Sequence, residues 1–422
     1  MAEETFLTDE FLRQLIDVGE VDILIGVPTH NNAKTIEPVI QAVQVGILKC
    51  FPRERAVIIN VDGGSRDGTS ELFAGASISD FQHASKFQTL RTLHSISTQY
   101  PNGPEAGAAL RTILAAAELL RAKACVVMSP DSTTVEPDWI QRLTLPIYKE
   151  NFDLVTPMYR RHKFEGLLMR NLLYPMTRAV YGCGLREPYA AEFAMSDRLA
   201  ADFLATDTWS NDLGRTGPEM CVTTRAITGN FRLCQSFLGT KVPVEGASTD
   251  LVAAMRRTVG VLFSSLDDNF QLWSQTNGSH PVPTFGSPAQ VSLEPVSVDR
   301  KRLREMFASG VSELQPVFRS ILSSSTLTEL QRIAAAEDGE AQYTADLWAR
   351  TVYEFAASYH KSVINRDHII QALVPLYRGR TLTFIAENEN ASAEQIESSV
   401  ECECVEFERL KPYLLELWNG GK

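Results

Sequence analysis

The stretch Val57-Ile-Ile-Asn-Val-Asp-Gly-Gly-Ser-Arg-Asp-Gly-Thr69 decides the fold. It begins as an apolar strand that ends at Asp62, and a turn of Gly, Ser and Asp then leads into a helix that opens near Thr69. An earlier strand over 22–27 ends in the polar run Pro28-Thr-His-Asn-Asn32. Two parallel strands with short polar loops at their carboxyl ends form a crevice of nucleotide size. The pair therefore predicts an α/β unit that binds a nucleotide.

Length and charge narrow the class of protein. The chain has 422 residues, of which 44% are hydrophobic, and this is enough for roughly two or three domains with real cores. The formal net charge is −12, which argues against a nucleic-acid-binding protein because such proteins present a basic field. A local cluster of Arg or Lys can still bind a small anion inside an acidic protein.

Cysteine usage and the first residues predict the compartment. The seven Cys are an odd number, and several lie in apolar runs such as 124–128, which favours reduced core thiols in a cytosolic protein. The N-terminus has no basic region followed by an apolar stretch, so we expect no signal peptide. No apolar run approaches the length of a membrane span. We therefore expect a soluble, cytoplasmic protein that crosses no membrane.

Strand and helix patterns alternate over the first part of the chain. This alternation predicts a doubly wound α/β unit with a parallel sheet. The expected strands are 22–27, 56–61, 90–95, 123–128 and 153–157, and the expected helices are 7–18, 35–48, 69–74 and 106–121.

Helical patterns predominate in the second part. They extend from Glu165 to Leu238, and Pro, Gly and Ser then mark a linker. Amphipathic segments follow at 298–309, 311–323, 326–336, 341–360 and 366–377. The default role of this last region is packing or formation of a homodimer. The expected divisions are an N-terminal helix over 1–21, a nucleotide-sugar domain over 22–276, a linker over 277–296 and a mostly helical C-terminal region over 297–422.

Two aspartates at predicted strand ends are candidate ligand-binding residues. Asp62 could accept hydrogen bonds from a base or a ribose hydroxyl, although a role in an Asx-turn or helix cap is the alternative. Asp67 fits a helix cap better. Asp131 follows the strand 124–127, where a hard cation that bridges a diphosphate would prefer oxygen ligands. The alternative for Asp131 is a turn-forming residue.

A basic run and two isolated acids complete the candidate residues. Arg160, Arg161 and Lys163 follow a strand end, and their side chains suit a carboxylate or a phosphate. The alternative is a solvated surface run. Glu192 and Glu219 lie near small residues and could orient sugar hydroxyls or stabilise positive charge at an anomeric carbon, or they could simply be solvated.

Several of these segments resemble GT-A glycosyltransferases related to family 2. Within that group the resemblance is to the retaining enzymes that make glucosylglycerate or mannosylglycerate and their phosphorylated forms. It runs from about residue 20 to 275, and a weaker match follows in the tail at 372–380. The best matches are Val61-Asp-Gly-Gly-Ser-Arg-Asp-Gly-Thr69, Tyr159-Arg-Arg-His-Lys-Phe-Glu-Gly166, Leu173-Tyr-Pro-Met-Thr-Arg-Ala-Val-Tyr-Gly182 and Phe231-Arg-Leu-Cys-Gln-Ser-Phe-Leu-Gly-Thr-Lys241.

The resemblance implies a GT-A fold and transfer of a hexose, with retention, from a nucleoside diphosphate sugar to a small hydroxy acid such as glycerate. It assigns catalytic roles to Glu192 and Glu219, and Asp131 to Mg²⁺ or Mn²⁺. The implied acceptor-binding residues are Arg160, Arg161 and Lys163. The implied donor-binding residues are Pro28, Thr29, Asn31, Asn32, Asp62, Gly107, Arg111 and Asp131.

The chain departs from the family pattern at four places, and three of these departures remove groups that neutralise the donor diphosphate. Since a charged hydrogen bond contributes about 1.5–3 kcal/mol, losing several would cost several kcal/mol. Two outcomes follow: weak or absent use of metal, with Arg111 or Lys241 supplying positive charge, or a protein that binds nucleotide sugars without catalysis. The departures are Ser129 for the first acid of Asp-x-Asp, Glu105-Ala-Gly107 for Gly-Lys-Gly, Pro243 for a metal-binding His, and Ala190-Ala191 for Gly-Gly before the loop acid.

Two further expectations concern the reaction. Glu165 beside Lys163 would repel a phosphate, so we expect an acceptor without a phosphate group. Nucleotidyl transfer is disfavoured because no Gly-rich loop with a trailing Arg and Lys follows the first strand.

Overall fold

The computed structural model describes residues 7–84, 93–100, 105–242, 250–287, 298–336 and 342–420, without the side chains of 77–84 and 212–213. By its internal contacts the chain divides into two compact units. The first unit comprises 1–160, 189–247 and 282–291, and the second comprises 161–188, 248–281 and 292–422. This division differs from the expected boundary near residue 277, because two segments before that point belong to the second unit.

A mixed sheet of eight strands forms the first unit, in the order β10-β8-β5-β7-β4-β1-β2-β3. Its strands are β1 (Ile23–Thr29), β2 (Ala56–Asp62), β3 (Leu93–Gln99), β4 (Ala124–Val127), β5 (Leu154–Arg160), β7 (Phe193–Ser196), β8 (Leu233–Thr240) and β10 (Thr284–Phe285). The predicted α/β fold class is confirmed. The sheet is not wholly parallel, however, because β7 runs antiparallel to both β4 and β5.

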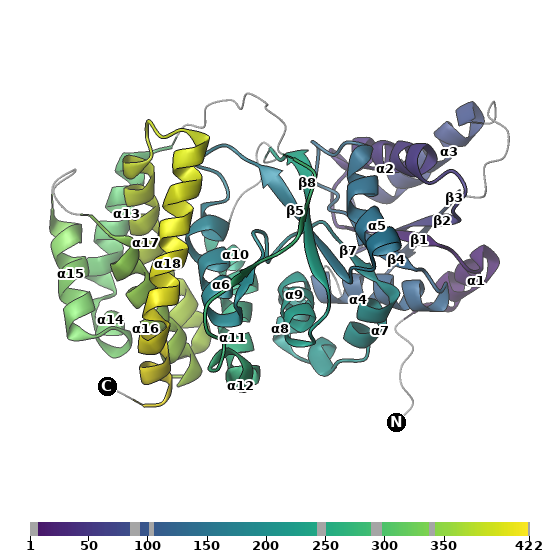
Figure 1. Cartoon of the computed structure of the whole chain (residues 1–422). Coiled ribbons are helices and arrows are strands. Elements are labelled where there is room, and N and C mark those ends of the chain that lie inside the picture. The colour runs from purple at the N-terminus through teal and green to yellow at the C-terminus, as the bar shows by residue number, and fades with distance from the viewer. Residues whose placement is uncertain are drawn as a thin grey trace. The chain divides into compact units, whose positions relative to one another are not determined.

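The register and direction of the strands place several of the predicted site residues at one edge of this sheet. Strands β1 and β2 pair in parallel, with Thr29 opposite Asp62 at their carboxyl ends. Strands β5 and β8 lie side by side and also run in parallel (Figure 1). Because β7 runs the other way, it begins where its neighbours end. Glu192, which directly precedes β7, therefore lies at the carboxyl edge of the parallel strands.

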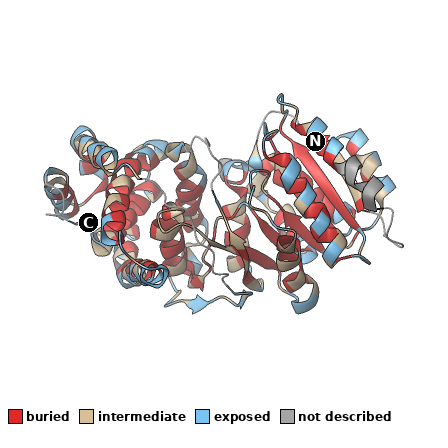
Figure 2. Ribbon diagram, turned by 90° about the horizontal axis from the view of Figure 1, so that it is seen from above, coloured by how far each residue is buried: buried red, intermediate tan, exposed pale blue. Residues whose placement is uncertain are grey.

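Helices cover both faces of the sheet. Two clusters of buried apolar side chains result, one containing Phe11, Ile113 and Phe203 and the other containing Val39 and Trp139. Burial is strongest in the sheet and on the helix faces turned towards it (Figure 2). The helices of this unit are α1 (Asp9–Val18), α2 (Ile36–Cys50), α3 (Thr69–Ala84), α4 (Ala106–Leu119), α5 (Asp138–Glu150), α7 (Asp197–Leu204), a 3₁₀ turn (Asp207–Ser210), α8 (Asp212–Thr216) and α9 (Pro218–Thr228).

The second unit is almost wholly helical in its described residues. Its helices are α6 (Tyr174–Tyr181), α10 (Leu251–Met255), α11 (Val261–Asp268), α12 (Phe270–Trp273), α13 (Arg300–Glu313), α14 (Gln315–Ile321), α15 (Ser324–Ala335), α16 (Ala345–His360), α17 (Arg366–Glu387) and α18 (Ala393–Trp418), with π-helical turns over Met169–Leu173 and Arg256–Gly260. A two-stranded sheet joins β6 (Cys183–Gly184) to β9 (His280–Pro281). Inside the helical packing, the fully buried Glu403 forms an ion pair with Arg380 at 2.5 Å.

Several elements differ from the sequence expectations. Helix α5 and strand β8 were not expected, α18 was expected only as part of a mostly helical C-terminal region, and part of the expected linker forms β9 and β10. Among the described residues, no helix combines the length and the apolar character that a membrane span needs.

Candidate functional site at the carboxyl edge of the sheet

Asp62 closes the turn after β2. Its Oδ1 accepts hydrogen bonds from the backbone N–H groups of Gly64 (2.7 Å) and Ser65 (2.6 Å), and its Oδ2 accepts from the hydroxyls of Thr29 and Ser70, both at 3.1 Å. The side chain has no exposed surface. Burial alone would raise its pKa, but these hydrogen bonds outweigh burial and lower it. The carboxylate thus has the turn-forming role that the sequence left open beside nucleoside binding.

The loop after β1 is tied to the same turn. The backbone N–H of Asn31 donates to the Ser65 hydroxyl at 2.8 Å, and the backbone N–H of Arg66 donates to the Asn31 side chain at 3.0 Å. Asn31 adopts φ of 57°, a left-handed conformation that Asn tolerates. Asn31 is exposed and Pro28 is half-buried, so this loop offers polar surface beside the turn.

Asp131 joins the end of β4 to the loop after β1. Its Oδ1 accepts from the Asn32 amide at 2.8 Å and from the Thr35 hydroxyl at 3.1 Å, while its backbone N–H donates to Ser129 Oγ at 3.3 Å. Asp131 is exposed, whereas Asn32 is buried. The structure therefore brings the predicted donor residues Asn32, Asp62 and Asp131 to one edge of the sheet.

Glu192 is the centre of a buried polar group at this edge. One of its oxygens accepts from the Ser132 hydroxyl, the other accepts from Tyr159 Oη at 2.5 Å, and Lys241 Nζ lies 2.8 and 2.7 Å from the two oxygens. Burial would raise the Glu192 pKa, but the Lys241 charge and these hydrogen bonds lower it. With no exposed surface, Glu192 acts on its surroundings through the side chains that it holds.

Lys241 reaches the surface, as does the half-buried Tyr159, whereas Ser132 and Glu192 are buried. Lys241 follows β8, its backbone N–H donates to the Arg160 carbonyl at 3.1 Å, and its side chain is 22% exposed. Its ammonium also lies 4.8 Å from the centre of the Tyr159 ring. From the sequence, Lys241 was expected only as a possible source of positive charge. Its position at the end of the matched stretch 231–241 was the one sign that it belongs to the site.

The residues at this edge do not fit a divalent cation. Mg²⁺ and Mn²⁺ need several oxygen ligands, yet Asp131 is the one acid in the segment 129–133. In the described part of the chain, no cluster of three or more His, Cys, Asp or Glu could hold a metal. Both oxygens of Glu192 are engaged by Lys241, so this carboxylate is not available as a metal ligand. Pro243, where the family pattern has a His, lies outside the described residues.

A cavity of about 650 Å³ opens at the first turn of α4. Two predicted donor residues, Gly107 and Arg111, line it, and the backbone N–H of its wall residue Tyr100 donates to the Asp62 carbonyl at 3.3 Å. A Cβ at position 107 would lie 2.1 Å from the carbonyl oxygen of Gly214, so only Gly permits this close approach. The volume is in the range of small-molecule sites. The lining residues are Tyr100, Glu105, Gly107, Ala108, Arg111, Thr112, Trp209, Ser210, Gly214 and Arg215.

Arg160 lies beside the Glu192 group, because it follows Tyr159 and its carbonyl accepts from Lys241, whereas the other predicted residues are not members of that group. Glu219 is half-buried in the first turn of α9, which packs against α4, α7 and α8. Arg160 ends β5 in the first unit. Arg161 and Lys163 belong to the second unit, where Arg161 forms two hydrogen bonds with Glu187 (3.2 and 3.0 Å) and Lys163 donates to the carbonyl of Glu389.

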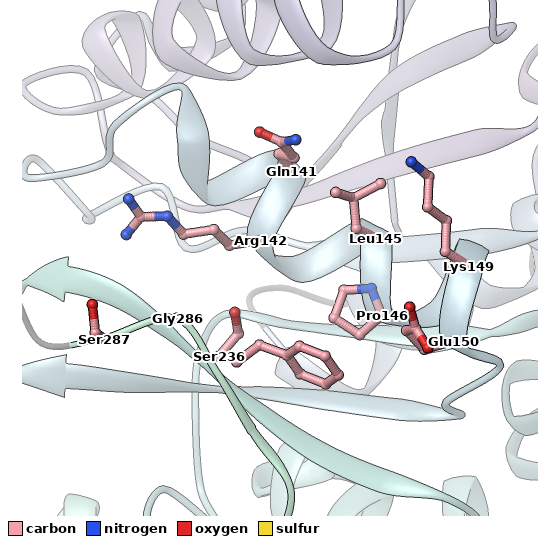
Figure 3. Close-up of a pocket in the computed structure, with 10 residues that line it drawn as sticks. Gln141, Arg142, Leu145, Pro146, Lys149, Glu150, Ser236, Gly286 and Ser287 are labelled. Atoms are coloured by element: carbon pink, nitrogen blue, oxygen red, sulfur yellow. The ribbon is translucent and has the colours of Figure 1, made fainter.

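A second cavity of about 450 Å³ lies between α5 and the strands β8 and β10. Figure 3 shows Arg142 and Ser287 at one end of it, and Lys149 and Glu150 at the other. None of the predicted site residues lines this cavity.

Comparison of this chain with known proteins finds similar solved structures, but no similar family or curated sequence. No protein-family model matches the chain, and no curated protein matches it. The chain is similar to solved structures of glucosyl-3-phosphoglycerate synthase from Mycobacterium tuberculosis. The complex with phosphoglyceric acid gives 20% identity and a TM-score of 0.43 over 62% of this chain and 85% of that one. The complex with Mn²⁺, uridine diphosphate and glucosyl-3-phosphoglycerate gives 20% identity and a TM-score of 0.43 over 63% of this chain and 86% of that one.

Those structures belong to the enzyme group that the sequence motifs resemble. At this identity and this TM-score the similarity says nothing of what the present chain binds.

Proposed function

We propose that the chain is a glycosyltransferase that moves a hexose from a nucleoside diphosphate sugar to a small hydroxy acid such as glycerate, with retention at the anomeric carbon. The observation that carries the proposal is the convergence of Asn32, Asp62, Asp131 and Lys241 at the carboxyl edge of the sheet. Ligands of open α/β sheets bind at this edge.

The donor would lie against the loops after β1 and β2 and extend into the cavity beside α4. The exposed Asn31 and the half-buried Pro28 would face the nucleoside, while the buried Thr29 and Asp62 hold the shape of that loop. Gly107 and Arg111 line the cavity, which offers a place for charged groups of the donor. Arginine suits phosphate because its planar fork donates two parallel hydrogen bonds.

The transfer itself needs no nucleophile from the protein. The bond between the anomeric carbon and the donor phosphate oxygen breaks, and the acceptor hydroxyl oxygen bonds to that carbon on the same face. The hydroxyl proton passes to the departing phosphate oxygen. The protein contributes by holding donor and acceptor in position and by neutralising charge on the leaving diphosphate.

The two glutamates would have different roles. Glu192 is a positioning residue because its oxygens contact only the side chains that it orients, above all Lys241. Glu219 is proposed to support the acceptor hydroxyl. Arg160, at the end of β5, is proposed to meet the acceptor carboxylate. Contact of Arg161 and Lys163 with the acceptor stays a prediction of the sequence, since both have partners within the second unit.

A nucleotide-sugar-binding protein without catalysis is the second candidate. The observation that favours it is Ser129, which leaves one carboxylate where the family pattern has two. Such a protein would bind the donor at the same edge without transferring its sugar.

A transfer assay separates the two candidates. Purified protein is incubated with UDP-glucose, GDP-glucose or GDP-mannose, together with glycerate or 3-phosphoglycerate, and products are identified by NMR. Formation of an α-linked glycosyl acid supports the proposal, with faster transfer to glycerate than to 3-phosphoglycerate. Donor binding without transfer or hydrolysis would support the second candidate, and a β-linked product would exclude retention.

A further inference from the structure

We infer that the chain neutralises the diphosphate of its donor with fixed side-chain cations, led by Lys241, in place of a divalent metal. This inference rests on the proposed function and deepens it. It begins from the disagreement between the metal that the family pattern implies and the residues present.

The first step is the shortage of metal ligands. Ser129 replaces one carboxylate, and the Oδ1 of Asp131 already accepts from the Asn32 amide and the Thr35 hydroxyl. Glu192, the next carboxylate at this edge, has both oxygens engaged and no exposed surface. Among the described residues of the segment 129–133 and the Glu192 group, a hard cation would therefore find at most one accessible carboxylate oxygen, which is too few for a protein-held site.

The second step is the place of the Lys241 ammonium. It is fixed by two contacts with Glu192 and by the Tyr159 ring beneath it. An ammonium has three N–H donors, so one remains for an oxygen of a ligand. Its 22% exposure provides access from the surface. A cationic N–H donor of fixed position thus occupies the region where β4, β5 and β8 end, and Glu192 balances part of its charge.

The third step is the pair of arginines at the neighbouring cavity. Arg111 and Arg215 both line it, and Arg215 is bridged to Glu105 at 2.7 Å. The Arg215 and Glu105 side chains are 49% and 34% exposed, and exposed ion pairs contribute little to stability. A phosphate can therefore take Arg215 from Glu105 at small cost.

Calorimetry on the intact chain tests the inference. Metal-stripped protein is titrated with UDP-glucose and with GDP-mannose in buffer that contains EDTA. The titrations are then repeated without EDTA, in Mn²⁺ at about 5 mM, a 5-fold molar excess over the nucleotide. The expected result is binding of one donor in EDTA, with a dissociation constant that Mn²⁺ changes by less than about threefold. The Lys241→Met variant should bind about tenfold to a hundredfold more weakly, because it loses a charge-assisted hydrogen bond.

The matched control is Lys123→Met. Lys123 lies at the opposite edge of the sheet, is bridged to Asp22 at 2.9 Å and lines neither the donor cavity nor the Glu192 group. The Lys123→Met variant loses the same charge as Lys241→Met, but its affinity for the donor should equal that of the unmodified chain. Lys241→Arg keeps the charge and should recover part of the affinity, and thermal unfolding of each variant checks that it is folded.

The outcomes separate the inference from the proposed function. Binding that requires Mn²⁺ would overturn the inference and leave the glycosyltransferase proposal intact. Unchanged affinity in a folded Lys241→Met variant would overturn the role of Lys241. Failure of the unmodified chain to bind any tested sugar nucleotide, with or without Mn²⁺, would overturn the proposed function itself.

Discussion

The two edges of the central sheet each hold a buried carboxylate paired with a cation, but the two pairs have different neighbours. At the amino edge, Asp153 accepts from Ser196 Oγ at 2.9 Å, from Arg198 and from the backbone N–H of Arg232 at 2.9 Å. Ser196 in turn caps α7, and Arg232 leads into β8. At the carboxyl edge, Glu192 accepts only from side chains within the described part of the chain.

This difference separates a folding role from a functional role. Asp153 fixes the path of the backbone where a helix and a strand begin, so its loss disturbs the fold. Glu192 fixes no backbone group and holds an ammonium that reaches the surface. Buried ion pairs are poor contributors to stability compared with apolar packing, which leaves orientation of Lys241 as the reason to bury Glu192.

The largest effect is expected for Asp153→Ala. It leaves Arg198 without its carboxylate and the Arg232 N–H without an acceptor, so the free energy of unfolding should fall by about 4 kcal/mol. Urea denaturation followed by circular dichroism measures the loss. The control is Asp197→Ala, an exposed aspartate at the same edge, which should cost less than about 1 kcal/mol. Equal losses for the two variants would contradict a folding role for Asp153.

Glu192→Gln should weaken donor binding by about 2 kcal/mol, or roughly thirtyfold, because an amide cannot hold the Lys241 ammonium in place. Its cost to unfolding should be smaller than that of Asp153→Ala, since the partly exposed Lys241 can turn to water. Calorimetric titration and urea denaturation measure both quantities. Glu37→Gln, an exposed change of the same chemistry on α2, should alter neither. If Glu192→Gln destabilised the chain without changing affinity, the functional role would be wrong.

Acid should remove the contribution of each carboxylate in a different pH range. Burial opposes ionisation of Glu192 and of Asp153, but their hydrogen bonds and cations lower both pKa values below the ordinary 4.5 and 3.8. A lowered pKa adds stability above the ordinary value, and this stability is lost as the pH falls through the lowered one. The stability gap between the unmodified chain and Glu192→Gln should therefore begin to close below about pH 4.5, and the gap to Asp153→Ala below about pH 3.8.

Urea denaturation between about pH 3 and 7 follows both gaps. Gaps that widen on acidification would have the wrong sign for carboxylates with lowered pKa values.

The smallest effect is expected for Ser132→Ala. The change removes one hydrogen bond to Glu192, while those from Tyr159 and Lys241 remain. The affinity for the sugar nucleotide should therefore fall only about threefold. Competition with a fluorescent nucleotide measures changes of this size. A loss as large as that of Glu192→Gln would mean that Ser132 contacts the donor itself.

Local patterns predicted the strand that ends at Asp62 and the strand that precedes Asp131, because each is an apolar run followed by a polar turn. The antiparallel strand β7 was missed, since Phe-Ala-Met-Ser has no β-branched residue and lies within the stretch 165–238 whose pattern predicted helices. The Glu192–Lys241 pair could not be predicted from local pattern, because its members are 49 residues apart and meet only when β7 and β8 take their places. Helix α18 lies in the region that was expected to be mostly helical, but its bounds were not predicted because acidic residues crowd its exposed face.

The contrast between the edges has one direct test, which is hydrogen–deuterium exchange of the intact chain with and without saturating UDP-glucose or GDP-mannose. With donor bound, we expect slower exchange in the turn at 63–69 and the first turns of α4, and no change at the amino edge around 148–153. Protection confined to the amino edge, or no protection with any sugar nucleotide, would contradict this expectation.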